Sequence, residues 1–436
     1  MSIPEPSALS ASFKNSFAFL TVRDRIPVIL TKVVDTVHRQ KHDMHARHGE
    51  EGWEDVKRIV GALSELKYRL QTDKPILELK TEKADAELWR QAFAEQQKMM
   101  PDDCSPSWFK SPWLFVECYL YRRIVNVFET SRFMQDWDPF RFLKEQAFIS
   151  TLPTMKRIAE FLLPVLHRAS TMTLEEKRDT LFDLLQVCLW GNKCDLSISA
   201  GVHQDHSDHN PLHQLRDLER NILVNDTAEI VQHLLPEVVA STNLILDNAG
   251  LELFCDLCLA EYLCAIGAST QLHLHLKAMP WFVSDATGAD FSWTLEMLRG
   301  SDHASLKQLG HQLQKRVENG DFLLKISPFW TTCYSYDRMQ ELDPSLHSTL
   351  SSSHLLIFKG DLNYRKLVGD LNWPSITPFS RALRGFEPAP LVALRTLKAD
   401  VTTGLQEGQA EAVEKEDKDW MVNGQWALVQ LFKPTS

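Results

Sequence analysis

The spacing of hydrophobic and polar positions changes once along the chain, near Thr227. Before this residue, nearly every periodic segment carries apolar residues three and four positions apart, which is the spacing of one helix face. Leu114, Cys118 and Tyr121 form such a stripe. The pattern therefore predicts an all-helical first half. The predicted helices span residues 24–39, 53–70, 84–98, 113–128, 155–169, 174–190 and 212–224.

After Thr227, short apolar runs alternate with helical patterns. Runs of β-prone residues closed by Gly, Asn or Asp are typical of buried strands. Strand alternating with helix is the βαβ arrangement of a parallel sheet covered on both faces, so this half is predicted to be α/β. The apolar runs are a Val/Leu/Ile stretch that leads into Leu246, Trp281–Val283, Leu355–Phe358 and Leu391–Leu394, and the helical patterns span residues 251–263, 293–300 and 304–317.

Three other segments complete this half. Residues 270–277 alternate strictly, which predicts a strand near the sheet edge with His273 and His275 at the surface. Residues 406–418 are charged and predict an exposed loop or helix. Residues 420–428 contain an Asn-Gly pair, which favours a closing hairpin or a terminal strand.

Length and composition narrow the class of protein. A chain of 436 residues exceeds the ~250–300 at which one core stops growing, so two domains or one elaborated domain are expected. Its net charge of −11 argues against nucleic-acid binding. No apolar run approaches the ~20 residues of a membrane helix and the N-terminus lacks a signal pattern, so we expect a cytoplasmic or nuclear protein.

The candidate chemistry lies in the loops that follow the apolar runs, because parallel strands present ligand sites at their carboxyl ends. Asp247, Asn248 and Asp285 supply oxygen ligands in two of these loops. Two carboxylates ~4 Å apart repel by ~4 kcal/mol at an effective dielectric of 20, a cost that a divalent cation removes. An all-oxygen set suits Mg²⁺ or Mn²⁺ better than zinc.

Basic residues follow the other two runs. Lys359, Arg365, Arg395 and Lys398 would bring positive charge to the opposite side of the pocket, where it suits phosphate. Phosphate monoesters hydrolyse so slowly in water that a metal ion together with fixed cations is a natural requirement. Asp361 or Asp247 would act as base, nucleophile or metal support.

Each of these patterns also has a plainer interpretation. The Asp-Asn-Ala-Gly loop alone is typical of a turn with a helix cap, and the basic loops alone are typical of solvated strand ends. Cys255 and Cys258 have redox spacing, but their apolar helical setting favours buried reduced thiols, as for the other scattered cysteines. The histidines at 203, 206, 209 and 213 resemble a metal-binding tract, although their setting favours a polar loop.

Six motifs in order resemble those of the damage-control phosphatase family, once catalogued as domain of unknown function 89. The resemblance is closest to its eukaryotic subfamily of metal-dependent sugar-phosphate phosphatases, whose marker is the Arg-Thr-x-Lys motif near the C-terminus. The motifs span residues 113–123, 189–197, 247–252, 284–285, 359–367 and 395–398.

The resemblance implies a mainly helical domain over residues 1–235 and a Rossmann-like three-layer α/β domain over residues 236–436. It implies an enzyme that uses Mn²⁺, Co²⁺ or Ni²⁺, with Mg²⁺ as a further candidate, to dephosphorylate fructose 1-phosphate and related sugar phosphates. We expect this enzyme to be a monomer. The implied metal ligands are Asp247, Asn248 and Asp285, and the implied substrate contacts are Asp361, Leu362, Asn363, Tyr364, Arg365 and Lys398, with Glu252 near the site.

Four polar residues of the helical half also lie in family motifs, namely Glu117, Arg122, Asn192 and Asp195. Glu117 and Arg122 lie five residues apart, about 140° round a helix, so these side chains cannot all enter one apolar core. Either some of them close the pocket over the sugar, or they form a polar brace between the domains.

Two other classes compete with the phosphatase. One is a protein-glutamate O-methyltransferase that uses S-adenosylmethionine, a label also attached to this subfamily. Glycine-rich cofactor loops are absent after the predicted strands, and the basic residues fit phosphate better than a sulfonium. The other is a noncatalytic binding protein. Phosphate release without consumption of S-adenosylmethionine would separate all three.

Overall fold

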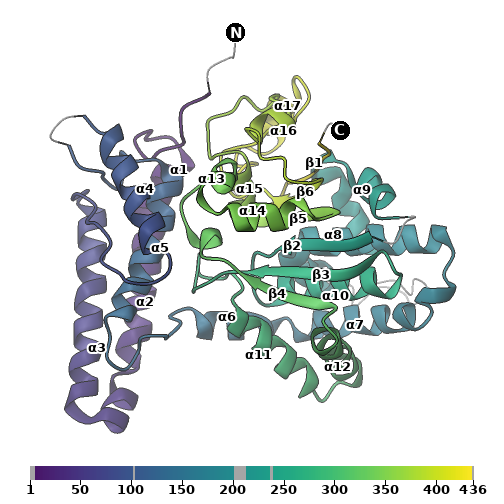
Figure 1. Cartoon of the computed structure of the whole chain (residues 1–436), viewed down its shortest axis with the longest axis horizontal. Coiled ribbons are helices and arrows are strands. Elements are labelled where there is room, and N and C mark those ends of the chain that lie inside the picture. The colour runs from purple at the N-terminus through teal and green to yellow at the C-terminus, as the bar shows by residue number, and fades with distance from the viewer. Residues whose placement is uncertain (1–4, 102–103, 201–212, 236–238, 435–436) are drawn as a thin grey trace.

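The computed structural model describes residues 5–101, 104–200, 213–235 and 239–434. Helices α2 to α5 gather at one side of the molecule, and the sheet with its flanking helices forms the other (Figure 1). The helices before the sheet are α1 (Phe17–Leu20), the π-helical η1 (Thr21–Arg25), α2 (Ile26–Arg39), α3 (Lys41–Gln71), α4 (Ala86–Met99), α5 (Trp113–Glu129), α6 (Arg141–Ser150), α7 (Leu152–His167), η2 (Ala169–Thr171) and α8 (Leu174–Ala200).

The second half alternates strands and helices as predicted. Its elements are η4 (His213–Asn221), β1 (Ile222–Asn225), α9 (Thr227–Leu234), β2 (Val239–Ile245), α10 (Leu251–Ala265), β3 (Ser269–Leu276), α11 (Gly288–Arg299), α12 (Ala304–Glu318), β4 (Phe322–Ile326), η5 (Pro328–Thr331), η6 (Tyr336–Arg338), α13 (Met339–Leu342), α14 (Pro344–Ser351), β5 (Leu355–Lys359), α15 (Gly360–Leu367), α16 (Phe379–Ala382), β6 (Leu391–Thr396), α17 (Gln409–Glu416) and β7 (Ala427–Phe432).

Within the described residues the strands form one seven-stranded sheet in the order β1-β7-β6-β5-β2-β3-β4. The strands from β6 to β4 run parallel, whereas β7 is antiparallel to β6 and parallel to β1. The chain leaves β2 toward β3 on one side, while β5 pairs with β2 on the other. The carboxyl ends of β2 and β5 therefore mark a switch point, where α/β sheets open a crevice.

Alternate residues of the central strands enter two different cores. Leu355 and Ile357 of β5 pack in the core that contains α7, α8, α10 and α12. Leu356 and Phe358 pack in the core that extends into helices α2 to α5. A strand covered on both faces needs such a continuous apolar run, which is the signal that predicted it. The predicted α/β class with helical layers is confirmed.

Helices α7 and α8 share a core with the sheet, and β1 lies before residue 235. The domain boundary at residue 235 stays a prediction. The predicted helices over residues 24–39, 113–128, 251–263 and 304–317 are confirmed as α2, α5, α10 and α12, within a few residues at each end.

Three sequence-based predictions were wrong. Residues 281–283 are not a strand but part of a turn after β3, in which Trp281 is buried by packing rather than by sheet pairing and Phe282 and Val283 are partly buried. The helix predicted over residues 212–224 is the short 3-10 segment η4 followed by strand β1. His275 is not at the surface: β3 lies between β2 and β4, and the ring is buried and bonded to Asn243.

The cysteines that the structure describes are free thiols, and Cys255 and Cys258 lie buried in α10, as predicted. The terminal strand predicted near residues 420–428 is present as β7. His203, His206 and His209 lie outside the described residues, as does the side chain of His213. Across the described segments, none of the helices has the length and apolar character that crossing a membrane requires.

Candidate metal and phosphate site

Four loops meet at the carboxyl edge of the sheet, around the ends of β2 and β5. The loop after β2 is fastened to residues 284–286 by two backbone hydrogen bonds. Ala249 N donates to Ser284 O at 2.7 Å, and Ala286 N donates to the carbonyl of Asp247 at 2.7 Å. The loops after β5 and β6 meet where Arg395 bonds to Asp361. The sequence-predicted acidic and basic loops therefore lie side by side.

Asp247 and Asp285 form the acidic centre of this edge. Both are buried, with 7% and 2% of their surfaces exposed. Burial, reinforced by the charges of Asp285 and Glu252, raises the pKa of Asp247 well above its usual range. Burial also raises the pKa of Asp285, to about 6, against the opposing charge of Lys277. Two neighbouring carboxyl groups that are both buried favour the binding of a positive charge.

Lys277 is a site residue that the sequence analysis missed. Its buried amine lies 3.3 Å from Asp285 Oδ2 and donates to the carbonyl of Leu246 at 2.6 Å. It directly follows β3, beside β2 in the sheet. A lysine at the end of the alternating segment 270–277 was the signal that could have found it, because neighbouring parallel strands end at the same edge.

Asn248 links the two acidic loops. Its amide donates to Asp247 Oδ2 at 2.9 Å and to Glu252 Oε2 at 2.8 Å, and its oxygen accepts a hydrogen bond from the Ser284 hydroxyl. The side chain of Asn248 therefore contacts residues of both acidic loops. A hydroxyl both donates and accepts, so Ser284 can support either orientation of the amide.

The loop that carries Asp285 has an unusual backbone. Phe282 and Val283 have φ values of 43° and 70°, in the left-handed region. A β-branched residue there is an outlier, and such strain persists only where surrounding contacts fix it. Phe282 stacks on Tyr121 of α5 at 4.5 Å between ring centroids. The helical half thereby holds the turn that delivers Asp285.

Gly360 makes room for the carboxylate of Asp247. It begins α15 with φ of 84°, and a Cβ at this position would lie 1.8 Å from Asp247 Oδ2. Both the backbone conformation and the close approach require glycine.

The predicted basic residues divide into buried and free groups. Lys359 is buried and contacts Asp256, Glu252 and the carbonyl of Cys188. Arg395 is buried and donates to Asp361 at 2.8 Å and to the carbonyls of residues 399 and 401. Lys398 is exposed, and its amine has no recorded partner within the described part of the chain. Lys398 is therefore the cation best placed to meet a ligand.

Residues 361–364 are fixed from several sides. Asp361 Oδ1 accepts hydrogen bonds from Arg395 and from the backbone N–H of Lys398. The buried Asn363 donates to the carbonyl of Lys359 at 2.7 Å. Tyr364 lies beneath the guanidinium of Arg395, 4.2 Å from ring centre to carbon, and the neighbouring Leu362 is buried.

Arg365 joins the helical half to the α/β half. Its guanidinium donates to Glu117 of α5 at 2.7 Å and to both oxygens of Asp370, and it stacks 3.6 Å over the Trp113 ring. Burial raises the pKa of Glu117 despite this arginine. In this structure, Glu117 and Arg365 therefore form a brace between the two halves.

Arg122 forms its ion pairs within the helical half. It is fully buried and contacts Asp85 at 2.6 Å and Glu129 at 3.0 Å. Asn192 and Asp195 lie on α8 beyond a kink at Trp190, the residue at which the predicted helix 174–190 was expected to end. Their side chains lie outside the described part of the structure.

Arg122→Ala is expected to lower the free energy of unfolding by about 3–5 kcal/mol, because it leaves buried carboxylates without their cation. Substrate preference should stay unchanged. Chemical denaturation and rates on several phosphate esters check both parts, with Arg123→Ala on the same helix as the control. A changed preference at wild-type stability would instead place Arg122 at the pocket.

The donor set fits a hard divalent cation. Asp285 Oδ2 is buried, and its contact among the described residues is the ammonium group of Lys277 at 3.3 Å. These residues hold no group of three His, Cys, Asp or Glu side chains suited to a metal, so the protein ligands would be two carboxylates and the amide of Asn248. Mg²⁺ and related ions commonly use one or two carboxylates and take their remaining ligands from water and substrate phosphate.

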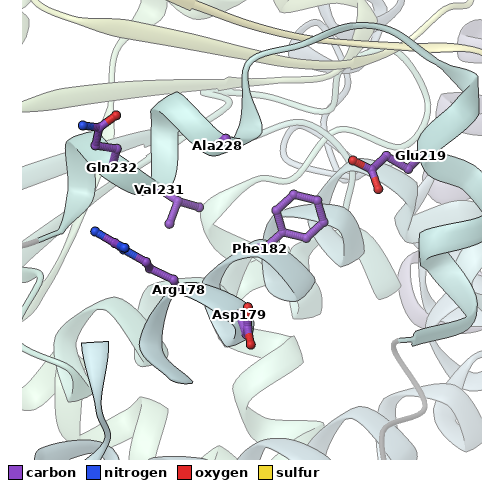
Figure 2. Close-up of a pocket in the computed structure, with 7 residues that line it drawn as sticks. All are labelled: Arg178, Asp179, Phe182, Glu219, Ala228, Val231 and Gln232. Atoms are coloured by element: carbon purple, nitrogen blue, oxygen red, sulfur yellow. The ribbon is translucent and has the colours of Figure 1, made fainter. Parts of the chain in front are cut away.

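A small cavity of about 40 Å³ opens at this edge. Its lining brings together Asp247, Glu252 and Lys398 with the apolar surfaces of Trp190 and Leu394. A larger cavity, of about 580 Å³, lies elsewhere, between α8, η4 and α9 (Figure 2). The described residues that line it are Arg178, Asp179, Phe182, Glu219, Ala228, Val231 and Gln232. None is a predicted site residue, so chemistry rather than size identifies the site.

Comparisons with known proteins match nearly the whole chain to one family. The model of the damage-control phosphatase ARMT1-like domain matches residues 21–413. Damage-control phosphatase ARMT1 of Danio rerio is 45% identical, and the match covers 98% of this chain and 97% of the relative. The proteins of the same name from Xenopus laevis and Homo sapiens are 43% and 39% identical, over 98% of this chain and 98% and 99% of their own lengths.

Proposed function

Because the chain belongs to the ARMT1-like damage-control phosphatase family, and is therefore a phosphatase, we propose that it hydrolyses sugar phosphates such as fructose 1-phosphate at the carboxyl edge of β2 and β5. The observation that carries this proposal is the cavity shared by Asp247 and Lys398. Its lining holds the buried carboxylates of Asp247 and Glu252 together with the exposed amine of Lys398. This pairing of charges suits a phosphate bridged between a metal ion and a lysine.

Asp247, Asn248 and Asp285 would hold the metal, and Mn²⁺, Co²⁺ and Ni²⁺ are the proposed ions, with Mg²⁺ also to be tested. A bound divalent cation supplies positive charge against the phosphoryl oxygens. Lys398 donates to a further phosphate oxygen. Trp190 and Leu394 offer apolar surface to the rest of the substrate, while a few polar groups fix its orientation.

Asp361 is the proposed base or sugar-hydroxyl acceptor. Its Oδ1 is held by Arg395 and by the backbone N–H of Lys398. Oδ2 has no recorded hydrogen bond to the part of the chain that is described, and can accept a proton or a sugar hydroxyl. Arg395 fixes this carboxylate rather than contacting phosphate, because its guanidinium is buried and donates to Asp361 and two carbonyls.

The decisive experiment measures phosphate release from a panel of sugar phosphates with Mn²⁺, Co²⁺, Ni²⁺ or Mg²⁺, and with a chelator as the control. Consumption of S-adenosylmethionine is followed in parallel with a glutamate-containing acceptor protein. Metal-dependent release without methyl transfer supports the proposal. Methyl transfer without phosphate release, or no release from any sugar phosphate, overturns it.

Lys398→Ala is expected to lower kcat/KM for the preferred sugar phosphate by at least about tenfold, because a lost charge-assisted hydrogen bond costs about 1.5–3 kcal/mol. The melting temperature should stay unchanged, since the side chain is exposed. Lys398→Arg should recover part of the rate. Lys415→Ala, another exposed lysine, is the control. A lower melting temperature with an unchanged rate would make Lys398 structural.

A further inference from the structure

We propose that Asp256, acting through Lys359, is a positioning residue that fixes Glu252 and Asn248 beside the metal site. This inference deepens the proposed function and rests on it. Asp256 does not face the cavity and has no place in the sequence-based assignment. Its contacts nevertheless connect it, through Lys359 and Glu252, to Asn248, the residue that links the two acidic loops.

The position of Asp256 is unusual for its helix. From Leu251 to Leu263, every residue of α10 is buried, and most are Leu, Cys, Ala or Phe. Glu252 and Asp256 lie four residues apart, so their carboxylates project from the same face one turn apart. Burying an unpaired carboxylate is costly, and a leucine would pack here without that cost. Two acids on one buried face therefore need a cation and suggest a task beyond folding.

Lys359 is the cation that both acids share. Its amine lies 2.8 Å from Asp256 Oδ1 and 3.2 Å from Glu252 Oε1, and it donates to the carbonyl of Cys188 at 2.7 Å. Three oxygens from two helices therefore surround the ammonium group. The amine is thus held at one point between α8, α10 and the end of β5, and does not reach out to a ligand.

The carbonyl of Cys188 explains why the lysine points this way. The helix α8 departs from helical geometry at Trp190, just after Cys188. The ammonium group of Lys359 donates to this carbonyl beside the kink. Gly191 follows and packs so closely on Glu252 that a Cβ there would lie 3.4 Å from the glutamate Cα. The kink, the lysine and the glutamate form one packed unit.

Glu252 connects Lys359 to Asn248. One of its oxygens meets Lys359, and the other accepts the Asn248 amide at 2.8 Å. The line of contacts therefore runs from Asp256 to Lys359, Glu252 and Asn248. If Asp256 were replaced by an uncharged residue, Lys359 would pair with Glu252 alone. This pairing would draw the Glu252 carboxylate away from Asn248. Partners behind a metal ligand typically affect metal affinity by 10–100-fold.

The test uses Asp256→Asn, which keeps the shape of the side chain and removes its charge. Mn²⁺ affinity is measured by calorimetry on the full-length protein without substrate, and kcat and KM are measured with the preferred sugar phosphate. We expect Mn²⁺ affinity to fall by about tenfold or more. Glu261→Gln is the matched control, because Glu261 is another buried acid of α10, paired with Arg316 away from the site. It should lower stability and leave Mn²⁺ affinity unchanged.

A double-mutant cycle separates positioning from a general effect of charge. In a Glu252→Gln background, Asp256→Asn should change Mn²⁺ affinity by less than about twofold, because the link to Asn248 is already broken. An equal loss in both backgrounds, a wild-type affinity in Asp256→Asn, or no Mn²⁺ binding by the wild-type protein overturns the inference. If the wild-type protein binds Mn²⁺ and the cycle behaves as expected, but no sugar phosphate is hydrolysed, the proposed function fails and the positioning role stands.

Discussion

Asp285→Asn is expected to lower metal-dependent kcat/KM by about a thousandfold or more. A divalent cation contributes several kcal/mol of transition-state stabilisation, and each 1.4 kcal/mol corresponds to a factor of ten in rate. The variant removes one of the two carboxylates proposed to hold the ion. Its amide oxygen still lies beside Lys277, so the fold should survive. Phosphate release at saturating Mn²⁺, together with calorimetric Mn²⁺ affinity, checks the result.

The pH dependence of Mn²⁺ affinity provides a second readout for this residue. Burial raises the pKa of Asp285 to about 6, so a proton must leave before a cation can bind at lower pH. Apparent Mn²⁺ affinity of the wild-type protein should therefore fall as the pH drops below about 6. Wild-type affinity and rate in Asp285→Asn would contradict the assignment of the metal site.

The same pKa determines how stability depends on pH without metal. A carboxyl whose pKa is raised by folding stabilises the folded state fully below its unfolded value of about 3.9, and that contribution is lost as the pH rises through the folded value. Relative to Asp285→Asn, the metal-free wild-type protein should therefore lose stability between pH 4 and pH 7. Mn²⁺ should restore it, because a ligand that binds only the folded protein stabilises it by mass action.

The gathering of three of the four loops could be predicted from sequence because it follows from strand direction. Asp247, Lys359 and Arg395 each come at or near the end of an apolar run, and parallel strands bring such ends to one edge. The helix that begins at Leu251 was equally visible, since its apolar residues extend over more than three turns. Both predictions depended on local periodicity, which a single sequence contains.

The partners of the buried cations could not be predicted in this way. Lys359 and Arg365 were expected to meet phosphate, yet in this structure they contact Asp256 and Glu117, which come from other helices. Sequence shows where a cation lies along the chain but not which anion the packing brings to it. Their phosphate roles remain predictions, and the contacts favour positioning and bracing instead.

The turn that carries Asp285 could not be predicted from sequence, for a different reason. Trp281, Phe282 and Val283 are β-prone, and three such residues in a row favour a strand. In the structure, Trp281 is buried and Phe282 stacks on Tyr121 of α5, so tertiary packing overrides local preference. Left-handed backbone at two consecutive nonglycine residues leaves no signal in the hydrophobic pattern.

Gly360→Ala is expected to lower kcat/KM by about a hundredfold or more, although it adds only one methyl group. The added Cβ would lie 1.8 Å from Asp247 Oδ2, so the carboxylate must move. A displacement of about 1 Å in a catalytic constellation can cost 10²-fold in rate. The left-handed φ of 84° adds about 1–2 kcal/mol of backbone strain. Mn²⁺ affinity should fall together with the rate, since Asp247 is a proposed metal ligand.

A second glycine separates the clash from the strain. Gly408 precedes α17 with φ of 79°, and a Cβ there would have no neighbour within 4 Å. Gly408→Ala should therefore lose only the ~1–2 kcal/mol that the left-handed backbone costs, and keep the wild-type rate and Mn²⁺ affinity. The two variants are compared by chemical denaturation, calorimetry and phosphate release. If both lose activity equally, strain and not the position of Asp247 accounts for the loss, whereas a selective loss in Gly360→Ala shows that the carboxylate must occupy the space that glycine leaves open.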